Sequence, residues 1–439
     1  MTEEVKKFTP KISNVQVINE ELTFTISGDN NYGFDKSLIN AIRRILLTEI
    51  PTVGFKLYDN GENNDINMII NNSSLHNEML LHRISLVPLY INPENFMKNY
   101  LFECKVIHDT AEPFKFITTD DINIYPLNSS LSERLEKYYD ESKEMTKEDE
   151  KLLLDQLNVL SIDNYDLKKP LSQKDKEDIF RPFEFRGVKN HCLITELKTT
   201  NTENIHQELH FYGSPSIGYG YEDAKFQAVS QSTYSFTINK DLVESVLDEK
   251  IKVEEIDKND IETYRNKFLL SESERYFYRD NYGEPNCYNF SLKSNHYYDE
   301  EILFMKSIKI LLEKCENLKL QLIEFLKEND SNISFIKRKE YVYLFEVLNE
   351  SHTLGNLVQS HIVRRCINNT TIVNNFSYKK PHPLEDKIYF ILSVNPKNKF
   401  IQKNDELVIK QNIITFVMEA IDEIINDIRI LYKISEKTF

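Results

Sequence analysis

The sequence predicts an α+β protein in which one chain carries two related modules and a mostly β insert. The first sign is a phrase, Ser37-Leu38-Ile39-Asn40, that returns as Thr353-Leu354-Gly355-Asn356, at an offset of 353 − 37 = 316 residues. The second is that an apolar strand pattern precedes each copy and an amphipathic helix follows it. The third is that each module ends in a long apolar helix.

The first module begins with a strand pattern over residues 12–27 and a polar turn at 28–31. Ser37 is the expected cap of the next helix, because its hydroxyl can accept a backbone N–H of the first turn. Pro51 should end that helix, and residues 53–57 should return to strand. The helix has one apolar face, made of Leu38, Ala41, Ile42, Ile45 and Leu46.

The second copy repeats this order. Residues 342–348 predict a strand, and Thr353 is the expected cap of the following helix. At the same offset of 316, the five positions of the apolar face hold Leu354, Leu357, Val358, His361 and Ile362. Only His361 is polar, so the apolar face is kept in both copies.

The long helices at the module ends carry apolar residues at spacings of four and three, the pattern of a helix packed on another helix. One holds Phe304, Ile308, Leu311, Cys315, Leu318, Leu322 and Phe325, and the other Ile414, Val417, Ile421, Ile424, Ile428 and Leu431. Burial of each helix on its own sheet is the alternative. We expect the modules to pair as an intramolecular pseudo-dimer. The residues expected to form that contact are Leu38, Ile42, Ile45, Phe304, Ile308, Leu311, Leu318, Leu354, Leu357, Val358, Ile362, Val417, Ile421, Ile424 and Ile428.

Four segments follow from this pattern. The first module comprises residues 1–57 and 286–330, the second comprises 331–439, and the insert comprises 58–285. Within the insert, the strongly charged excursions near 129–180 and 240–285 are expected to be surface helices or mobile segments. The basic run at 335–339 is expected to be a linker between the modules.

Composition limits the function classes. The chain has 439 residues, 40% of them hydrophobic, which is enough for about two or three domains. A net charge of −16 disfavours broad nucleic-acid binding. We see no apolar run that could cross a bilayer and no signal-peptide core, which points to the cytosol or a connected compartment. The five cysteines are widely spaced, as expected of reduced and mostly buried thiols.

The sequence offers no convincing chemistry of its own. His206 and His210 resemble a zinc-protease pair only superficially, because the segment alternates like a strand. His76 and His82 lack the spacing of helical metal ligands. The glycine-rich residues 213–220 lack the Lys-Ser/Thr that closes a phosphate-binding loop. We therefore expect no catalytic residues, no metal and no cofactor.

Longer motifs carry a family resemblance. Residues 40–53 (NAIRRILLTEIPTV) and 71–89 (NNSSLHNEMLLHRISLVPL) resemble the signature of the alpha-like assembly subunit of multisubunit RNA polymerases. That family includes the third-largest subunit of eukaryotic polymerase II, the archaeal D protein and bacterial alpha. Residues 218–226 (GYGYEDAKF) resemble another element of the same family. Residues 352–357 (HTLGNL) and 378–385 (YKKPHPLE) resemble its smaller partner, the eleventh subunit of polymerase II or the archaeal L protein.

The resemblance implies two alpha-like dimerisation modules, from subunits that are separate in cells, fused in one chain. Such a fusion is similar to the arrangement in large cytoplasmic DNA viruses, so we expect a viral source. The protein would then act in the cytoplasm of an infected cell and in the virion, and otherwise in the nucleus. Some relatives hold zinc or an iron–sulfur cluster through a Cys cluster in the insert. The widely spaced cysteines of this chain argue against one here.

The implied function is that of a non-catalytic assembly subunit of a DNA-directed RNA polymerase, which nucleates association of the two largest subunits. Small zinc-binding subunits are further implied partners, whereas sequence-specific nucleic-acid binding and membranes are not. Two rival functions are an interaction scaffold outside transcription and, less favoured, a hydrolase built on the segment of His206 and His210.

Five residues are the expected contacts with the second-largest subunit: Arg43, Arg44, His82, Arg83 and Lys225. At the offset of 316, Arg43 and Arg44 correspond to Gln359 and Ser360, so the fold of the module does not need the arginine pair. We hypothesise that the two guanidinium groups pair with carboxylates or carbonyls of that subunit. An ordinary solvated helix face is the alternative.

Overall fold

The computed structural model describes residues 8–58, 64–94, 96–109, 112–139, 147–158, 161–199, 206–258, 260–295, 297–327, 333–366, 373–398 and 405–439. They form two compact units, described separately here. Unit 1 comprises Met1–Glu49, Val229–Ser294 and Asp299–Phe439, and unit 2 comprises Ile50–Ala228 and Asn295–Tyr298. The expected mixture of helices and strands is confirmed. The module boundaries inferred from the sequence remain predictions.

The first sheet of unit 1 is antiparallel, with strand order β1-β2-β14-β13. Its strands are β1 (Lys11–Ile18), β2 (Glu21–Ser27), β13 (Val229–Phe236) and β14 (Cys287–Ser294). The single strand expected over residues 12–27 is therefore wrong. Asn19 and Glu20, with φ of 53° and 60°, make a tight turn that separates β1 from β2.

Two equivalent helices begin one residue before the repeated phrase: α1 (Lys36–Thr48) and α9 (His352–His361). The expected caps, Ser37 and Thr353, are wrong by two residues. Asp35 caps α1 by accepting the N–H of Ser37 at 2.8 Å, and Ser351 caps α9 by accepting the N–H of Thr353 at 3.3 Å. Both capping residues have extended backbone, which is the conformation a cap requires.

The second sheet of unit 1 has the order β15-β16-β18-β17 and is also antiparallel. Its strands are β15 (Ile333–Lys339), β16 (Val342–Leu348), β17 (Val373–Lys379) and β18 (Lys387–Val394). The basic run at 335–339 lies in β15, so its prediction as a linker is wrong. A π-helical turn, η5 (Ile362–Cys366), follows α9 directly.

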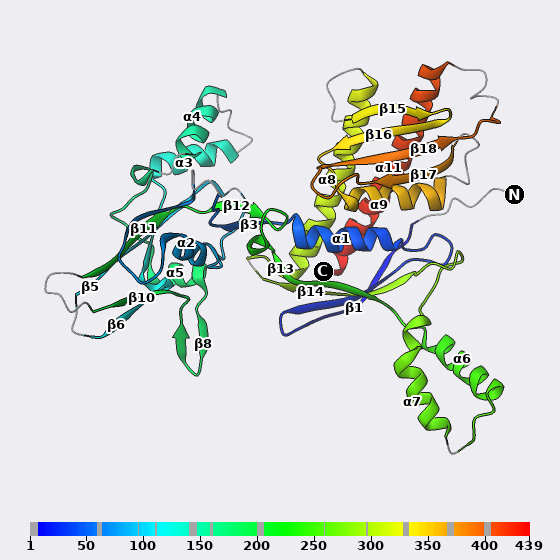
Figure 1. The fold of residues 1–439 in the computed structure, drawn as a ribbon, viewed down its shortest axis with the longest axis horizontal. Coiled ribbons are helices and arrows are strands. Elements are labelled where there is room, and N and C mark those ends of the chain that lie inside the picture. Colours follow the sequence, from blue (N-terminus) through cyan, green and yellow to red (C-terminus); the bar gives the residue numbers. More distant parts are fainter. Residues whose placement is uncertain are drawn as a thin grey trace. The chain divides into compact units, whose positions relative to one another are not determined.

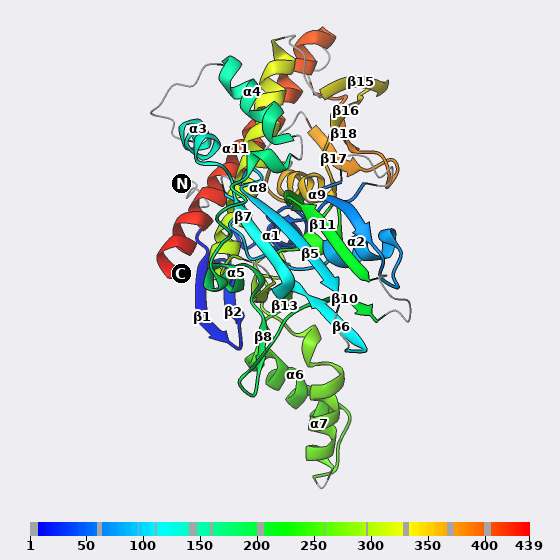
Figure 2. The same cartoon turned by 90° about the vertical axis from the view of Figure 1, so that its left-hand side faces the viewer.

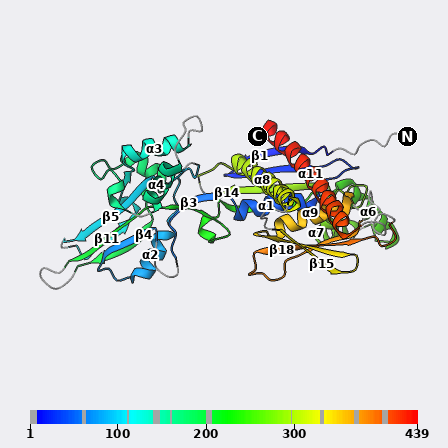
Figure 3. The ribbon, with the colours of Figure 1, turned by 90° about the horizontal axis from the view of Figure 1, so that it is seen from above.

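The long helices are α8 (Glu300–Leu326) and α11 (Glu406–Thr438), and they pack side by side (Figures 1 and 3). Helices α1 and α9 also contact each other, and α1 lies along the first sheet (Figure 1). All the side chains that the sequence assigned to the module contact are buried, from Leu38 to Ile428. The periodicity therefore located buried faces of these helices, and the role of these residues in pairing the modules remains a prediction.

Unit 2 contains a sheet of order β4-β11-β5-β7, whose central strands are visible in Figure 2. These strands are β4 (Ile66–Asn71), β5 (Tyr100–His108), β7 (Ile122–Pro126) and β11 (Gln207–Gly213). Shorter pairs accompany it: β3 (Pro51–Gly54) with β12 (Ser216–Tyr219), β6 (Phe114–Thr118) with β10 (Leu193–Lys198), and β8 (Phe183–Phe185) with β9 (Val188–Asn190). Helix α2 (Asn77–Ser85) contributes Leu80 and Ile84 to the core of this unit.

The charged excursions are helical. The first contains α3 (Ser129–Tyr139), α4 (Lys147–Asn158) and α5 (Gln173–Phe180), and the second contains α6 (Lys240–Val253) and α7 (Ile261–Ser271). Each excursion also buries apolar residues. Leu131, Leu135, Leu153 and Leu157 pack together in the first, and Val243, Leu247 and Phe268 in the second. Both are thus packed helices rather than solvated charge alone.

Among the helices that the structure describes, none has the length and apolarity needed to span a bilayer. Burial raises the pKa of the Cys104 and Cys315 thiols to about 12, with nearby carboxylates contributing. Cys287 is half-buried and Cys192 is exposed, so the expectation of mostly buried thiols holds for only part of the set. The side chain of Cys366 lies outside the described residues.

Candidate interface between the two halves of unit 1

Unit 1 has an α1 half, residues 8–49, 229–294 and 299–327, and an α9 half, residues 333–366, 373–398 and 405–439. Two polar contacts join α1 to α9. The Nε of Arg44 donates to the Oγ1 of Thr353 at 2.9 Å, and the Oγ of Ser360 donates to Oδ2 of Asp35 at 2.7 Å.

These two contacts join nearly equivalent positions in the two copies of the repeat. Arg44 and Ser360 are the ninth residues of their helices, and 360 − 44 = 316. Each bonds to the start of the other helix, where Asp35 and Thr353 lie. This reciprocity is typical of an isologous contact between two like surfaces.

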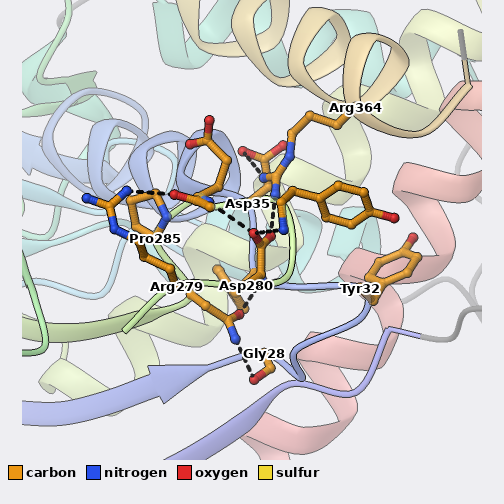
Figure 4. A network of polar contacts seen from close by, with 12 residues as sticks. Gly28, Tyr32, Asp35, Arg279, Asp280, Pro285 and Arg364 are labelled. Carbon is orange, nitrogen blue, oxygen red and sulfur yellow. Dashed lines mark hydrogen bonds and ion pairs between the residues drawn. The ribbon is translucent and has the colours of Figure 1, made fainter. Parts of the chain in front are cut away.

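A buried charge cluster lies beside these contacts (Figure 4). Arg364, in η5, points between two carboxylates. Its Nη2 lies 2.8 Å from Oδ2 of Asp280, and its Nη1 lies 3.5 Å from Oδ1 of Asp35. The exposed fraction of the side chain is 0% for Asp280, 9% for Asp35 and 18% for Arg364. One guanidinium of the α9 half thus serves two carboxylates of the α1 half.

Backbone geometry holds Asp280 in place. Its Oδ1 accepts the N–H groups of Tyr282 and Glu284 at 2.9 and 3.0 Å. Gly33 approaches from the other side with φ of +75°, and a Cβ there would lie 2.5 Å from Oδ2 of Asp280. Only glycine accommodates both that conformation and that approach.

The turn before α1 is bonded to the same return segment. The amide of Asn286 accepts the N–H of Phe34 at 2.9 Å and donates to the carbonyl of Gly28 at 3.2 Å. The hydroxyl of Tyr288 donates to the carbonyl of Phe34 at 3.0 Å. These bonds hold the turn and the return segment together within the α1 half, and the same segment reaches the α9 half through the contact of Asp280 with Arg364.

Other ion pairs link the halves along α8. Lys314 lies 3.1 Å from Glu49 of the α1 half and 3.4 Å from Glu350 of the α9 half. Burial raises the pKa of Glu350, although Lys314 opposes that shift. Burial lowers the pKa of Lys314, but the two carboxylates outweigh it and the net shift is upward. Lys319 and Asp422 form a more exposed pair at 2.6 Å.

Apolar contacts complete the interface. Phe439 follows α11, and its ring lies edge-on to the rings of Phe24 and Phe304. The centre of the Phe439 ring is 5.4 Å from that of Phe24 and 5.6 Å from that of Phe304. His361, the polar member of the α9 stripe, is buried and has its Nε2 3.0 Å from Oε2 of Glu423. The stripe thus accommodates a histidine by giving it a partner on α11.

The predicted partner-binding residues are separated among these elements. Arg43 is half-buried and donates from Nε to Oδ1 of Asn40 at 3.0 Å. Arg44 lies at the contact between the halves. In unit 2, His82 is exposed on α2, while Arg83 donates to the carbonyl of Ile194 at 2.8 Å. Their contact with another subunit remains a prediction.

Lys225, in unit 2, belongs to an aromatic cluster. Its Nζ lies 3.6 Å from Oδ2 of Asp223 and 5.2 Å from the centre of the Phe226 ring. That ring packs directly on Gly54 and Gly218, where a Cβ would come within 2.8 and 2.6 Å of it. The glycines of this motif therefore serve the close approach of an aromatic ring.

Two motifs near the C-terminus meet in space. A Cβ on Gly355 would lie 2.6 Å from the ring of Tyr378. The hydroxyl of Tyr378 lies 3.3 Å from Nδ1 of His352, and its N–H donates to Oε1 of Gln359 at 3.3 Å. Residues quoted from separate motifs thus form one packed contact between α9 and β17.

The segment of His206 and His210 has the strand geometry expected for it, because β11 includes His210 while His206 precedes that strand. The Nε2 of His210 lies 3.2 Å from Oε1 of Glu103. Within the described part of the chain, no group of three or more His, Cys, Asp or Glu side chains is arranged to hold a metal ion.

Sequence reasoning missed the charge cluster. Asp35 could have been found, since an aspartate just before an amphipathic helix is a strong capping signal. Ser360 and Arg364 lie off the apolar stripe and look like ordinary surface residues. Nothing in the sequence connects Asp280, inside a charged excursion, with Arg364.

Comparison with known proteins gives two family matches. Residues 23–315 match a family described as the RNA polymerase Rpb3/Rpb11 dimerisation domain, and residues 343–433 match a second family of the same description. The matches fall on the α1 half together with unit 2, and on the α9 half.

Individual relatives agree with these matches. The DNA-directed RNA polymerases I and III subunit RPAC1 of Mus musculus is 24% identical over 325 residues, covering 70% of this chain and 82% of the relative. The human protein of the same name is 23% identical over 308 residues, covering 64% of this chain and 77% of the relative. The DNA-directed RNA polymerase subunit Rpo3 of Methanosphaera stadtmanae is 32% identical over 73 residues, covering 17% of this chain and 24% of the relative.

Proposed function

Because the chain belongs to the family of RNA polymerase Rpb3/Rpb11 dimerisation domains, we propose that it nucleates assembly of a DNA-directed RNA polymerase. Its relatives are polymerase subunits, which makes a subunit of such an enzyme the coarse assignment. The finer proposal is a non-catalytic scaffold on which the two largest subunits associate. An interaction scaffold outside transcription is not favoured by these relatives.

The reciprocal contacts between α1 and α9 carry this proposal. We propose that the two matched regions are paired modules, fused as an intramolecular pseudo-dimer whose first module carries the insert. The seams of α8 against α11 and of α1 against α9 support that pairing. Fusion replaces a bimolecular encounter by a tethered one, with an effective concentration of roughly millimolar order.

The proposed partners are the largest and second-largest polymerase subunits and small zinc-binding subunits. Arg43 on α1 and His82 on α2 are proposed contacts with the second-largest subunit. Arg44 and Arg83 each use Nε in an internal hydrogen bond, which orients the rest of the guanidinium. Lys225 is proposed as a further contact, held in place by Asp223 and the Phe226 ring.

We further propose a large cytoplasmic DNA virus as the source, on the ground that one chain carries two matches to the Rpb3/Rpb11 dimerisation domain. The protein would then act in the cytoplasm of the infected cell and be packaged in the virion. In a cellular source it would act in the nucleus.

Reconstitution tests the function. The two largest subunits and the small subunits are co-expressed with this chain, or without it, and assembly is followed by size-exclusion chromatography and promoter-independent RNA synthesis. We expect that omission abolishes the assembled complex, and that the isolated chain makes no RNA. Normal assembly and RNA synthesis without the chain would refute the proposal.

A further inference from the structure

We propose that the cluster of Asp35, Asp280 and Arg364 selects the partner of each half. It permits the α1 half to pair with the α9 half, and it excludes pairing of either half with a second copy of itself. The inference rests on the proposed pairing of the two halves within one chain, and it concerns which of the possible pairings the interface tolerates.

The repeat identifies the equivalent positions. Asp35 and Ser351 are the caps of α1 and α9, and 351 − 35 = 316. At the same offset the equivalent of Arg364 is Thr48, the last residue of α1, since 364 − 48 = 316. The two charges thus each occur in one copy of the repeat, while a neutral hydroxyl residue stands at each equivalent position.

Pairing of two α1 halves would bury an unpaired anion, Asp280. The twofold exchange would place Thr48 of the second copy where Arg364 now lies. Asp280 has a fully buried side chain, so its carboxylate would lose its cation without gaining water. Asp35 would lose Arg364 too, but Arg44 of the second copy would lie beside it in the place of Ser360. An uncompensated buried charge is strongly destabilising, and in a twofold interface the same unpaired charge occurs twice.

Pairing of two α9 halves fails for the opposite reason. Arg364 would face Ser351 of the second copy in place of Asp35. A guanidinium with an exposed fraction of only 18% would then have a neutral hydroxyl for its partner. Each like pairing is thus opposed by buried charge of one sign, which is a repulsive element of the kind that specific interfaces need.

The remaining contacts between α1 and α9 do not discriminate in this way. A like pairing of α1 halves would set Arg44 against Ser37, the equivalent of Thr353, which is also a hydroxyl, and beside Asp35 in the place of Ser360, so these contacts do not oppose it. The apolar stripes are similarly interchangeable, with Leu38 equivalent to Leu354 and Ile42 equivalent to Val358. Apolar burial drives all three pairings, so the charge cluster decides among them.

The test uses the full chain carrying two different affinity tags, co-expressed in one cell. Capture of the second tag through the first reports pairing between copies, and light scattering gives the mass. The triple variant Asp35→Asn, Asp280→Asn, Arg364→Met removes the charges while keeping their size, and Asn remains a good helix cap. We expect the wild-type chain to be monomeric, and the triple variant to capture roughly tenfold more of the second tag.

The matched control is Lys319→Met with Asp422→Asn. This pair also joins the two halves, but its side chains are 31% and 45% exposed, so its removal should leave capture at the wild-type level. A triple variant as monomeric as wild type would overturn the inference. So would equal capture by the control and the triple variant. Capture by the wild-type chain at the level of the triple variant would overturn this inference, because removal of the charges would then change nothing.

A second comparison tests the inference if the triple variant does not fold. Arg364→Met alone leaves two buried carboxylates, whereas Arg364→Met with Asp280→Asn leaves one. We expect the double variant to melt at a higher temperature than the single variant, because a buried charge has been removed. Equal or lower melting temperature in the double variant would contradict the inference. Recovery of other polymerase subunits is measured separately, and its loss bears on the proposed function alone.

Discussion

Arg44 of α1 donates a hydrogen bond from Nε to the Oγ1 of Thr353, the second residue of α9, at 2.9 Å. The two residues come from opposite ends of the chain. They belong to different motifs, and the pairing of α1 with α9 is what brings them together. An arginine that looks available for another subunit therefore also fastens the two halves of unit 1.

Replacement of Arg44 by Met or of Thr353 by Val should each lower the free energy of unfolding by about 1–2 kcal/mol, since a charge-assisted hydrogen bond is lost. The double variant should lose less free energy of unfolding than the sum of the losses in the two single variants. Urea unfolding of the four proteins measures this coupling. Strict additivity would show that the contact does not stabilise the fold. Arg43→Met, whose side-chain hydrogen bond lies within α1, is the control.

Lys314→Met should lower stability by about 3 kcal/mol at pH 8, because Glu350 would keep a buried charge without its cation. Burial raises the pKa of Glu350 in the folded chain, so the stability this group contributes is present below its unfolded pKa and is lost as the pH rises through the folded pKa. Without Lys314 that folded pKa should rise further.

The difference in stability between the Lys314 variant and wild type should therefore be smaller at about pH 5 than at pH 8, because a lower pH favours the protonated, uncharged form of Glu350. Urea midpoints at both pH values measure it. A difference that stays constant would contradict the assignment. Lys319→Met, which removes a more exposed ion pair of the same helix, should cost less than about 1 kcal/mol at either pH.

Gly355→Ala should destabilise the α9 half by about 1–3 kcal/mol, since its Cβ would meet the Tyr378 ring at 2.6 Å. Tyr378→Leu in the same chain should recover part of that loss by making room. Thermal melting of the single and double variants measures the rescue. If Gly355→Ala melts with the wild-type chain, the close approach of the ring is not a constraint.

Phe439→Ala should cost about 1–2 kcal/mol, because its ring packs edge-on against Phe24 and Phe304 of the α1 half. The same substitution at Lys437, which is exposed, should change little. Urea unfolding compares the two. A loss confined to Phe439 supports a seam that continues to the last residue of the structure, and equal effects would argue against it.

The apolar seams were predictable from sequence because a spacing of four and three residues reports directly which side of a helix is buried. Phe304, Leu311, Ile421 and Ile428 illustrate this, since all are buried. The offset of 316 residues likewise located α1 and α9. Both expected caps lie two residues too late, because Ser37 and Thr353 are hydroxyl residues inside the first turn, whereas the caps are the extended residues Asp35 and Ser351.

The charge cluster was not predictable. Asp35, Asp280 and Arg364 lie in three segments that no periodicity connects. Asp35 carries only the signal of a helix cap, and Asp280 and Arg364 each resemble a surface charge. The packing of the charged excursions was also hidden, because leucines such as Leu153 stand among many Lys and Glu residues, which are typical of a solvated surface. Such features depend on tertiary contacts, which a single sequence does not encode locally.

The most direct test of the central claim is purification of the tagged full chain from its native source, followed by identification and quantification of the chains that remain bound. The account predicts stoichiometric recovery of the largest and second-largest subunits of an RNA polymerase, with no separate subunit matching the α9 half. Recovery of the chain without those large subunits, or with a separate partner in place of its own α9 half, would contradict it.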